Sequence, residues 1–273
     1  MVDVVFVADA FVYDIPQGGA ELVNYEVVNF LKNNGLRVEE VYSFKLTPAY
    51  INNRKDSVFI IGSFLNTPSS ALEALKDVAY YLYEHDHKYC INRNPAVYKD
   101  FIIPPNELVH QELFSGAKKV MCQSQFQANI LGKNFPNLKN IVNMGGSLWS
   151  QDFLESVKKN INSPAARTEK AAILKSENPI KGQQAAESFC QKNNIEYDLI
   201  QESTPLQLFK KLQEYTYYIY FPTTPETFSR VFMEAKLAGC KIITNKLIGA
   251  ATENYTYNDP LVLLKEVISH KSQ

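Results

Sequence analysis

The 273-residue chain lacks several features that mark common classes of protein. Its net charge is only −1, so its composition does not favour attraction to nucleic acid or to an anionic membrane. It has no apolar run near the roughly 20 residues that a membrane span requires. Its first residues carry an early acid and no basic segment, so we expect a first strand there and not a signal peptide.

Cysteine is scarce and scattered, at Cys90, Cys122, Cys190 and Cys240. The absence of a CxxC pair argues against a structural zinc site, and thiols within apolar runs are typical of a reducing, cytoplasmic compartment. A GxGxxG motif is missing after the expected first strand, which excludes the usual fingerprint of an NAD-dependent enzyme. The chain also shows no internal repeat and no low-complexity tract.

Short apolar runs alternate with helical patterns from end to end, which is typical of doubly wound parallel sheets. Strands are expected at 4–8, 38–44, 57–64, 79–84, 119–123, 140–144, 171–174, 197–201, 217–221 and 241–244. Helices are expected at 20–33, 69–76, 107–115, 125–134, 150–160, 181–193, 205–214 and 261–270. The polar stretch 162–169 contains a proline and reads as a linker. We therefore predict an α/β protein with two Rossmann-like lobes, 1–160 and 161–273.

The stretch 225–239 contains two carboxylates, Glu226 and Glu234, eight residues apart. The spacing predicts a helix with Glu226 at its mouth and Glu234 two turns in, both projecting from nearly the same side. A helix that starts after a buried strand directs amide N–H groups into the crevice where α/β proteins bind phosphorylated ligands.

Two loops between a strand and a helix have residues suited to an anion. Gly18 and Gly19 let the backbone approach a ligand, although such a pair is also common in a plain turn with a helix cap. Lys175 and Lys181 flank a short loop and could neutralise a diphosphate leaving group, or could be solvated surface lysines.

His85 and His87 lie at the end of an expected strand, where alternation would place them on one face. Three interpretations stay open: a metal site with a neighbouring acid, histidines satisfied structurally at a strand end, or contacts to a sugar or acceptor. The metal interpretation lacks a third ligand at a supporting spacing.

The stretch 225–239 resembles the donor-site signature of retaining GT-B-fold glycosyltransferases of the family-4, group 1 type. The resemblance implies that Glu226 lies by the donor sugar and that Glu234 holds the ribose hydroxyls, with Thr227 and Phe228 in the donor site. It also implies that Gly18 and Gly19 face the diphosphate. The loop 175–182 resembles the family's Arg-x5-Lys-Gly element, but Lys175 replaces the arginine and cannot form its bidentate fork.

The resemblance implies a GT-B protein with an abbreviated second lobe, because the chain lacks a strand–helix–strand portion before residue 205 that helps hold the base in the family. We expect a retaining, metal-independent hexosyltransferase that moves a sugar from a nucleotide-diphosphate sugar to a glycan or other hydroxyl acceptor. The first lobe would be acceptor-side and the second would bind the donor nucleotide. No separate cofactor, metal or nucleic-acid partner is expected, and a homo-oligomer is left open. The rivals are a catalytically inactive binding module and a half-enzyme that needs a partner chain.

Overall fold

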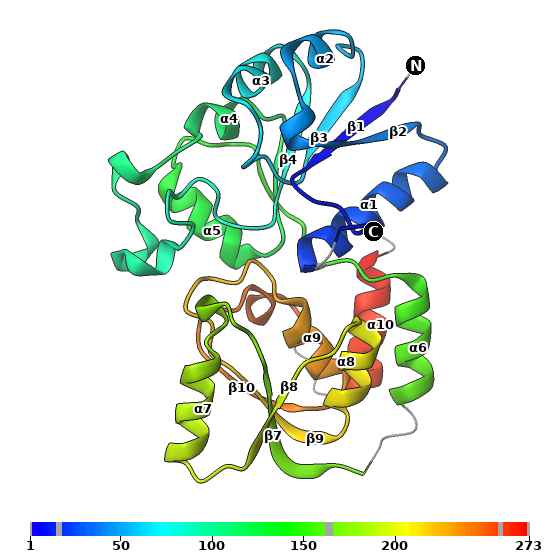
Figure 1. Cartoon of the computed structure of the whole chain (residues 1–273), viewed down its shortest axis with the longest axis vertical. Coiled ribbons are helices and arrows are strands. Elements are labelled where there is room, and N and C mark those ends of the chain that lie inside the picture. Colours follow the sequence, from blue (N-terminus) through cyan, green and yellow to red (C-terminus); the bar gives the residue numbers. More distant parts are fainter. Residues whose placement is uncertain (1, 15–17, 162–165, 256–258, 272–273) are drawn as a thin grey trace. The chain divides into compact units, whose positions relative to one another are not determined.

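The computed structural model describes residues 2–14, 18–161, 166–255 and 259–271. The chain divides into two compact units, residues 1–148 and 149–273, each with a parallel sheet and helices packed on it (Figure 1). Part of the expected linker, residues 162–165, lies outside the described residues.

Within its described residues, the first unit has a six-stranded parallel sheet in the order β2-β1-β3-β4-β5-β6. The strands are β1 (Val4–Ala8), β2 (Val38–Tyr42), β3 (Val58–Ile61), β4 (Tyr80–Glu84), β5 (Val120–Cys122) and β6 (Ile141–Asn143). The helices are α1 (Gly19–Asn33), α2 (Pro48–Asn52), α3 (Ser69–Ala74), α4 (Gln111–Gly116) and α5 (Gln125–Asn134). Short 3-10 turns lie at Ser43–Lys45, Leu75–Asp77, Pro95–Val97, Lys99–Phe101 and Pro105–Glu107.

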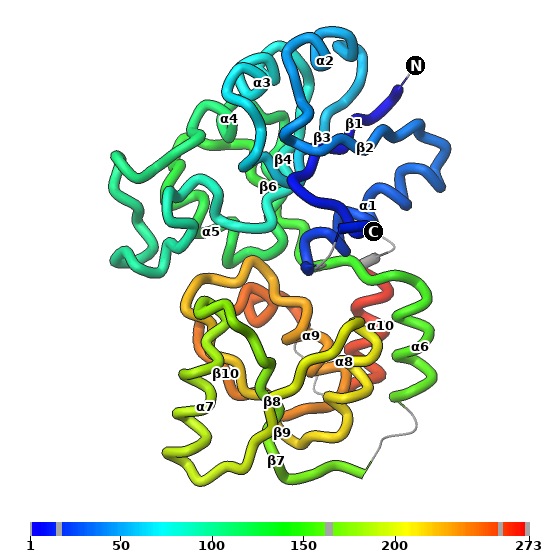
Figure 2. Tube along the Cα trace, viewed as in Figure 1, coloured from blue at the N-terminus to red at the C-terminus, as the bar shows by residue number. Residues whose placement is uncertain are grey.

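The sheet of the first unit is buried on both faces, as parallel sheets are. Val5 and Val7 of β1 belong to one apolar cluster, whereas Phe6 and Ala8 pack with Val28 of α1 on the other side. The chain runs from β1 to β2 on one side and then crosses to β3 on the other (Figure 2). The carboxyl ends of β1 and β3 therefore form a topological switch point, the usual place for a ligand in such sheets.

The second unit has, over its described ranges, a four-stranded parallel sheet in the order β10-β9-β7-β8. Its strands are β7 (Thr168–Leu174), β8 (Tyr197–Ile200), β9 (Tyr215–Tyr220) and β10 (Lys241–Thr244). Its helices are α6 (Gln151–Ile161), α7 (Gln183–Lys192), α8 (Pro205–Leu212), α9 (Arg230–Leu237) and α10 (Pro260–Lys271), with 3-10 turns at Pro179–Lys181 and Gly249–Thr252. The switch point of this sheet lies between β7 and β9.

Helix α6 belongs to the second unit, although the expected boundary at residue 160 placed it in the first lobe. Its buried residues Phe153, Leu154 and Val157 join the main apolar cluster of that unit, and the helix packs against α8 and α10. The boundary consequently falls after Leu148, ahead of the polar stretch that resembled a linker.

The four cysteines all lie in described ranges and are buried free thiols. Among the described helices, none combines the length and the hydrophobicity that crossing a membrane demands.

Candidate functional site

A lysine, a glutamate and a tyrosine meet at the switch point of the second unit. The Lys181 Nζ lies 2.8 Å from the Glu226 Oε1, and the Tyr220 hydroxyl donates a hydrogen bond of 2.5 Å to the same oxygen. Glu226 keeps only 14% of its side chain exposed, against 37% for Lys181. Burial, followed by the charge of Glu226, raises the pKa of Tyr220, so its hydroxyl stays protonated and donates. The site therefore pairs one half-exposed cation with one nearly buried carboxylate.

A glycine lets the two loops of this site approach each other. Gly182 has φ +67°, and a Cβ at this position would lie 1.7 Å from the carbonyl oxygen of Phe221. The Thr223 N–H donates to the Ile180 carbonyl oxygen at 2.9 Å, which joins the loop after β7 to the loop after β9. No residue other than glycine fits at 182 without moving this backbone. The glycine thus permits the contact between the two loops, and this contact holds Lys181 beside Glu226.

Glu226 does not lie on the helix that the sequence predicted for it. It forms a parallel bridge with Ile248: its N–H donates to the Leu247 carbonyl oxygen at 2.8 Å, and its own carbonyl oxygen accepts from the Gly249 N–H at 2.9 Å. Helix α9 begins only at Arg230, after Ser229 with φ 75°. The expectation that both glutamates share one face of a helix is therefore wrong, since only Glu234 is helical.

Glu234 lies buried inside the second unit. The Trp149 indole Nε1–H donates to Glu234 Oε1 at 2.9 Å, and the Arg230 Nη2 lies 3.7 Å from the same oxygen. Burial raises the pKa of Glu234, while Arg230 and the indole act in the opposite direction.

Three further residues of the expected donor site lie in the second unit and differ in exposure. Lys175 follows β7 and is exposed, whereas Thr227 and Phe228 are buried. The Phe228 ring packs in the core, 6.2 Å from the Trp149 ring and 6.0 Å from the Tyr255 ring. The backbone of Phe228 makes a separate contact, since its carbonyl oxygen accepts from the Ala250 N–H at 2.8 Å. Its side chain is thus part of the core.

In the first unit, Gly18 and Gly19 are exposed at the start of α1, after the switch-point strand β1. The Gly18 N–H donates to Glu21 Oε2 at 2.7 Å. A carboxylate already lies where the helix start would attract an anion, which is the capping arrangement. A phosphate at Gly18 would have to replace this contact.

His85 and His87 lie beyond β4, which ends at Glu84, so strand alternation does not describe them. The His85 Nε2 lies 2.7 Å from Asn24 Oδ1, and the His87 Nδ1 lies 2.9 Å from the Tyr89 hydroxyl. Burial, and then the charge of Lys88, lowers the pKa of His85 to about 3. In the part of the chain that the structure describes, no three His, Cys, Asp or Glu residues are grouped to hold a metal ion.

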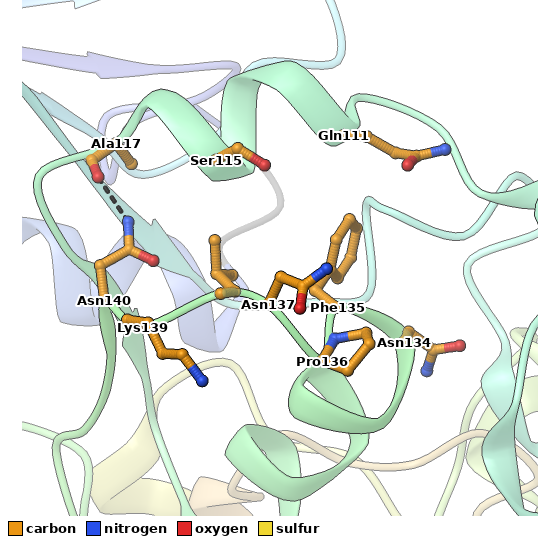
Figure 3. A pocket seen from close by; sticks show the side chains of 10 residues that line it. Gln111, Ser115, Ala117, Asn134, Phe135, Pro136, Asn137, Lys139 and Asn140 are labelled. Atoms are coloured by element: carbon orange, nitrogen blue, oxygen red, sulfur yellow. Dashed lines mark hydrogen bonds between the residues drawn. The ribbon is translucent and has the colours of Figure 1, made fainter.

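A hollow of about 670 Å³ in the first unit is lined by the ends of α4 and α5 and the loop before β6 (Figure 3). None of the expected site residues lines it. Asn134 uses its amide to accept from the Ile103 N–H and to donate to the Phe101 carbonyl oxygen, and Asn140 donates to the Ala117 carbonyl oxygen. The hollow lies where β5 and β6 begin, at the edge opposite the switch point, so we assign it no role in donor binding.

Sequence reasoning missed three residues that contact Glu226 or Glu234 in the structure: Tyr220, Trp149 and Arg230. Tyr220 is the last residue of β9, a position that points to the carboxyl edge of the sheet. Arg230 precedes Glu234 by four residues, the spacing at which side chains pair on a helix. Trp149 lies far from Glu234 in sequence and carried no comparable signal.

No protein-family model and no curated protein matches the chain. HepE of Anabaena, in complex with UDP and glucose, is 14% identical with a TM-score of 0.57, over 99% of this chain and 91% of that chain. A glycosyltransferase of Rickettsia africae is 14% identical with a TM-score of 0.53, over 99% and 92% of the two chains. An α-glucosyltransferase in complex with UDP and a DNA is 10% identical with a TM-score of 0.52, over 100% and 91%. The expected architecture is confirmed: the chain has the GT-B fold of these glycosyltransferases.

Proposed function

We propose that the protein is a glycosyltransferase that moves a hexose from a nucleotide-diphosphate sugar to a glycan or other hydroxyl acceptor, with retention of anomeric configuration and without a metal ion. One observation carries the proposal: Lys181, Glu226 and Tyr220 converge at the carboxyl ends of β7 and β9. A cation and an oriented carboxylate at a switch point suit a phosphorylated sugar. Retention and metal independence rest on the resemblance of the stretch 225–239.

The reaction breaks the bond between the anomeric carbon and the diphosphate oxygen, and the electron pair leaves with the diphosphate. The acceptor hydroxyl oxygen forms the new bond to the anomeric carbon, and its proton passes to the departing diphosphate. Lys181 and Lys175 would stabilise the charge that develops on this leaving group. Glu226 would accept hydrogen bonds from the donor-sugar hydroxyls and orient the anomeric carbon. Since Lys181 already contacts Glu226, one ammonium would link the sugar-binding carboxylate to the phosphate.

Glu234 would accept hydrogen bonds from the ribose of the nucleotide. The HepE and α-glucosyltransferase complexes contain UDP, so UDP-sugars are the first donors to test. The first unit would serve the acceptor, with Gly18 and Gly19 near the diphosphate. His85 and His87 would contact the sugar or the acceptor.

The experiment is a thermal-shift screen of nucleotide sugars, followed by measurement of nucleoside-diphosphate release. We expect one donor to raise the melting temperature and to be turned over. Glu226→Gln should lower turnover by about 100-fold, the scale of losing one oriented polar contact to the reacting group. Lys181→Ala should lose donor affinity and turnover together.

Lys170→Ala is the matched control, because Lys170 forms only a surface ion pair with Asp198 at 3.4 Å in the same unit. Its turnover should equal that of the wild type. Undiminished transfer by both Glu226→Gln and Lys181→Ala would refute the site assignment. Failure of the wild type to bind any nucleotide sugar would refute the proposed function.

The second candidate is a binding module without turnover. It is favoured by the direct path from α7 through β8 to α8, which omits the portion that helps hold the base in the family. Donor binding with no diphosphate release, in the presence of candidate acceptors, would support it.

A further inference from the structure

The sole tryptophan of the chain contacts the carboxylate that the proposed function assigns to the ribose. Trp149 is the first residue of the second unit and only 1% exposed. Its indole N–H donates to Glu234 Oε1 at 2.9 Å, and Arg230 lies over its ring at 4.9 Å from the centroid. The three side chains form one cluster, Arg230–Trp149–Glu234, in which Trp149 and Glu234 are buried and the Arg230 side chain is 11% exposed.

The cluster fixes the orientation of the carboxylate. An indole has a single N–H, which can only donate, so its hydrogen bond selects one carboxylate oxygen. The Arg230 Nη2 lies 3.7 Å from the same oxygen, Oε1. Both contacts therefore hold Oε1 against the protein, and Oε2 would be the oxygen that accepts from the ribose.

Burial makes this orientation matter. Glu234 is 2% exposed, and a buried carboxylate is costly unless hydrogen bonds or opposite charges compensate it. Trp149 and Arg230 supply that compensation. Without the indole N–H, Oε1 would need a new donor, and rotation of the carboxylate would be the simplest way to find one.

We propose that Trp149 is the positioning residue of Glu234 and that, through it, the site selects a ribonucleoside diphosphate over its 2′-deoxy analogue. The inference rests on the proposed function, whose ribose contact it explains. Trp149 acts through Glu234 and does not itself touch the reacting atoms.

The experiment measures by calorimetry the Kd of UDP, 2′-deoxy-UDP and UMP for five full-length proteins: wild type, Trp149→Phe, Phe209→Leu, Glu234→Gln and the double variant Trp149→Phe/Glu234→Gln. Trp149→Phe keeps an aromatic ring and removes the N–H. Phe209 is fully buried in the same apolar cluster and packs against Phe153, so Phe209→Leu is the control for loss of core packing alone.

We expect the wild type to bind UDP about tenfold more tightly than 2′-deoxy-UDP, as one well-made hydrogen bond to a charged group would give. In Trp149→Phe this ratio should fall several-fold toward one, while the preference for UDP over UMP is kept. Phe209→Leu should melt at a lower temperature with an unchanged ratio. Glu234→Gln should lose the ratio as Trp149→Phe does, and the double variant should lose no more.

The outcomes distinguish a failure of the inference about Trp149 from a failure of the proposed glycosyltransferase function. If the wild type prefers UDP and Trp149→Phe keeps the full preference, Trp149 is only a packing residue and the inference is overturned. If the wild type binds both nucleotides equally, the ribose contact is absent and the inference fails while sugar transfer still stands. If the wild type binds no UDP and no other nucleoside diphosphate, the proposed function itself fails.

Discussion

His85 shows how burial sets the chemistry of one side chain. Its Nε2 faces Asn24 Oδ1 at 2.7 Å, and burial together with the Lys88 charge brings its pKa to about 3. At neutral pH the ring is therefore neutral. Because Oδ1 only accepts, Nε2 carries the proton in this geometry, and Nδ1 is the acceptor nitrogen. Any contact of His85 with a sugar would then be a neutral hydrogen bond.

The depressed pKa of His85 predicts a loss of stability in acid. An unfolded histidine titrates near about 6.5, so below that pH the unfolded chain takes up a proton that the folded chain refuses. From about pH 7 to about pH 5 the free energy of unfolding should drop by about 2 kcal/mol through this residue. Urea unfolding of wild type and His85→Gln at both pH values checks this. An equally steep pH dependence in the variant would assign the effect to other groups.

Helix α7 illustrates how the start of an element can place a functional side chain. Gly182 caps the helix in the left-handed region and lies against the loop that follows β9, at Phe221, and the residue before it is Lys181. A helix that started one residue earlier or later would move the ammonium away from Glu226. In the sequence this glycine is part of the Lys-Gly element. The structure shows why a glycine is needed there: the neighbouring backbone at Phe221 leaves no room for a side chain.

Gly182→Ala should destabilise the second unit more than a left-handed conformation alone explains. Gly35 is the matched control, since its φ is +84° and its position has open space around it. Gly35→Ala should cost about 1–2 kcal/mol of unfolding free energy, the strain of a non-glycine residue at positive φ. Gly182→Ala adds the clash with the Phe221 carbonyl oxygen, so we expect a loss above about 3 kcal/mol. Hydrogen exchange measures the unfolding free energy of each unit separately. An equal loss of unfolding free energy in Gly35→Ala and Gly182→Ala would show that the backbone at Phe221 moves to relieve the clash, against the prediction.

Taken as a whole, the chain has separate apolar clusters for its two sheets. The main cluster of the second unit joins α6, α8, α9 and α10 on one face of the sheet, whereas a smaller one packs α7 on the other. Residues of β7 alternate between the two, with Ala172 in the first cluster and Ala171 and Ile173 in the second. Trp149 and α6 thus complete a core that begins before the polar stretch 162–169.

The boundary after Leu148 predicts which fragment folds. A fragment 149–273 should unfold cooperatively in urea. A fragment 161–273 lacks Trp149, Phe153, Leu154 and Val157, each at most 7% exposed. Loss of such side chains removes about 1.5–3 kcal/mol of burial each, comparable in sum to the stability of a small domain. Cooperative unfolding of 161–273 with native circular dichroism would contradict the boundary.

Periodicity alone carried most of the fold. The ten expected strands all appear, because an uninterrupted apolar run such as β1 can be recognised as a strand without knowing which strands it pairs with. The expected helix 107–115 starts later, at Gln111, and the short α2 escaped notice because five residues give too little pattern. Glu226 was assigned to a helix because its spacing from Glu234 allowed one. Its pairing with Ile248, which is distant in sequence, decided otherwise.

Local sequence was enough to specify the α/β class, the two sheets, the loop that holds Lys181 and the helix that holds Glu234, since apolar runs and glycines act over a few residues. Three features required the tertiary structure: the membership of α6, the contact between Lys181 and Glu226, and the placement of Trp149 on Glu234. Each joins residues separated by tens of positions. Such contacts depend on which faces pack together, and packing of distant faces leaves no periodic trace in the chain.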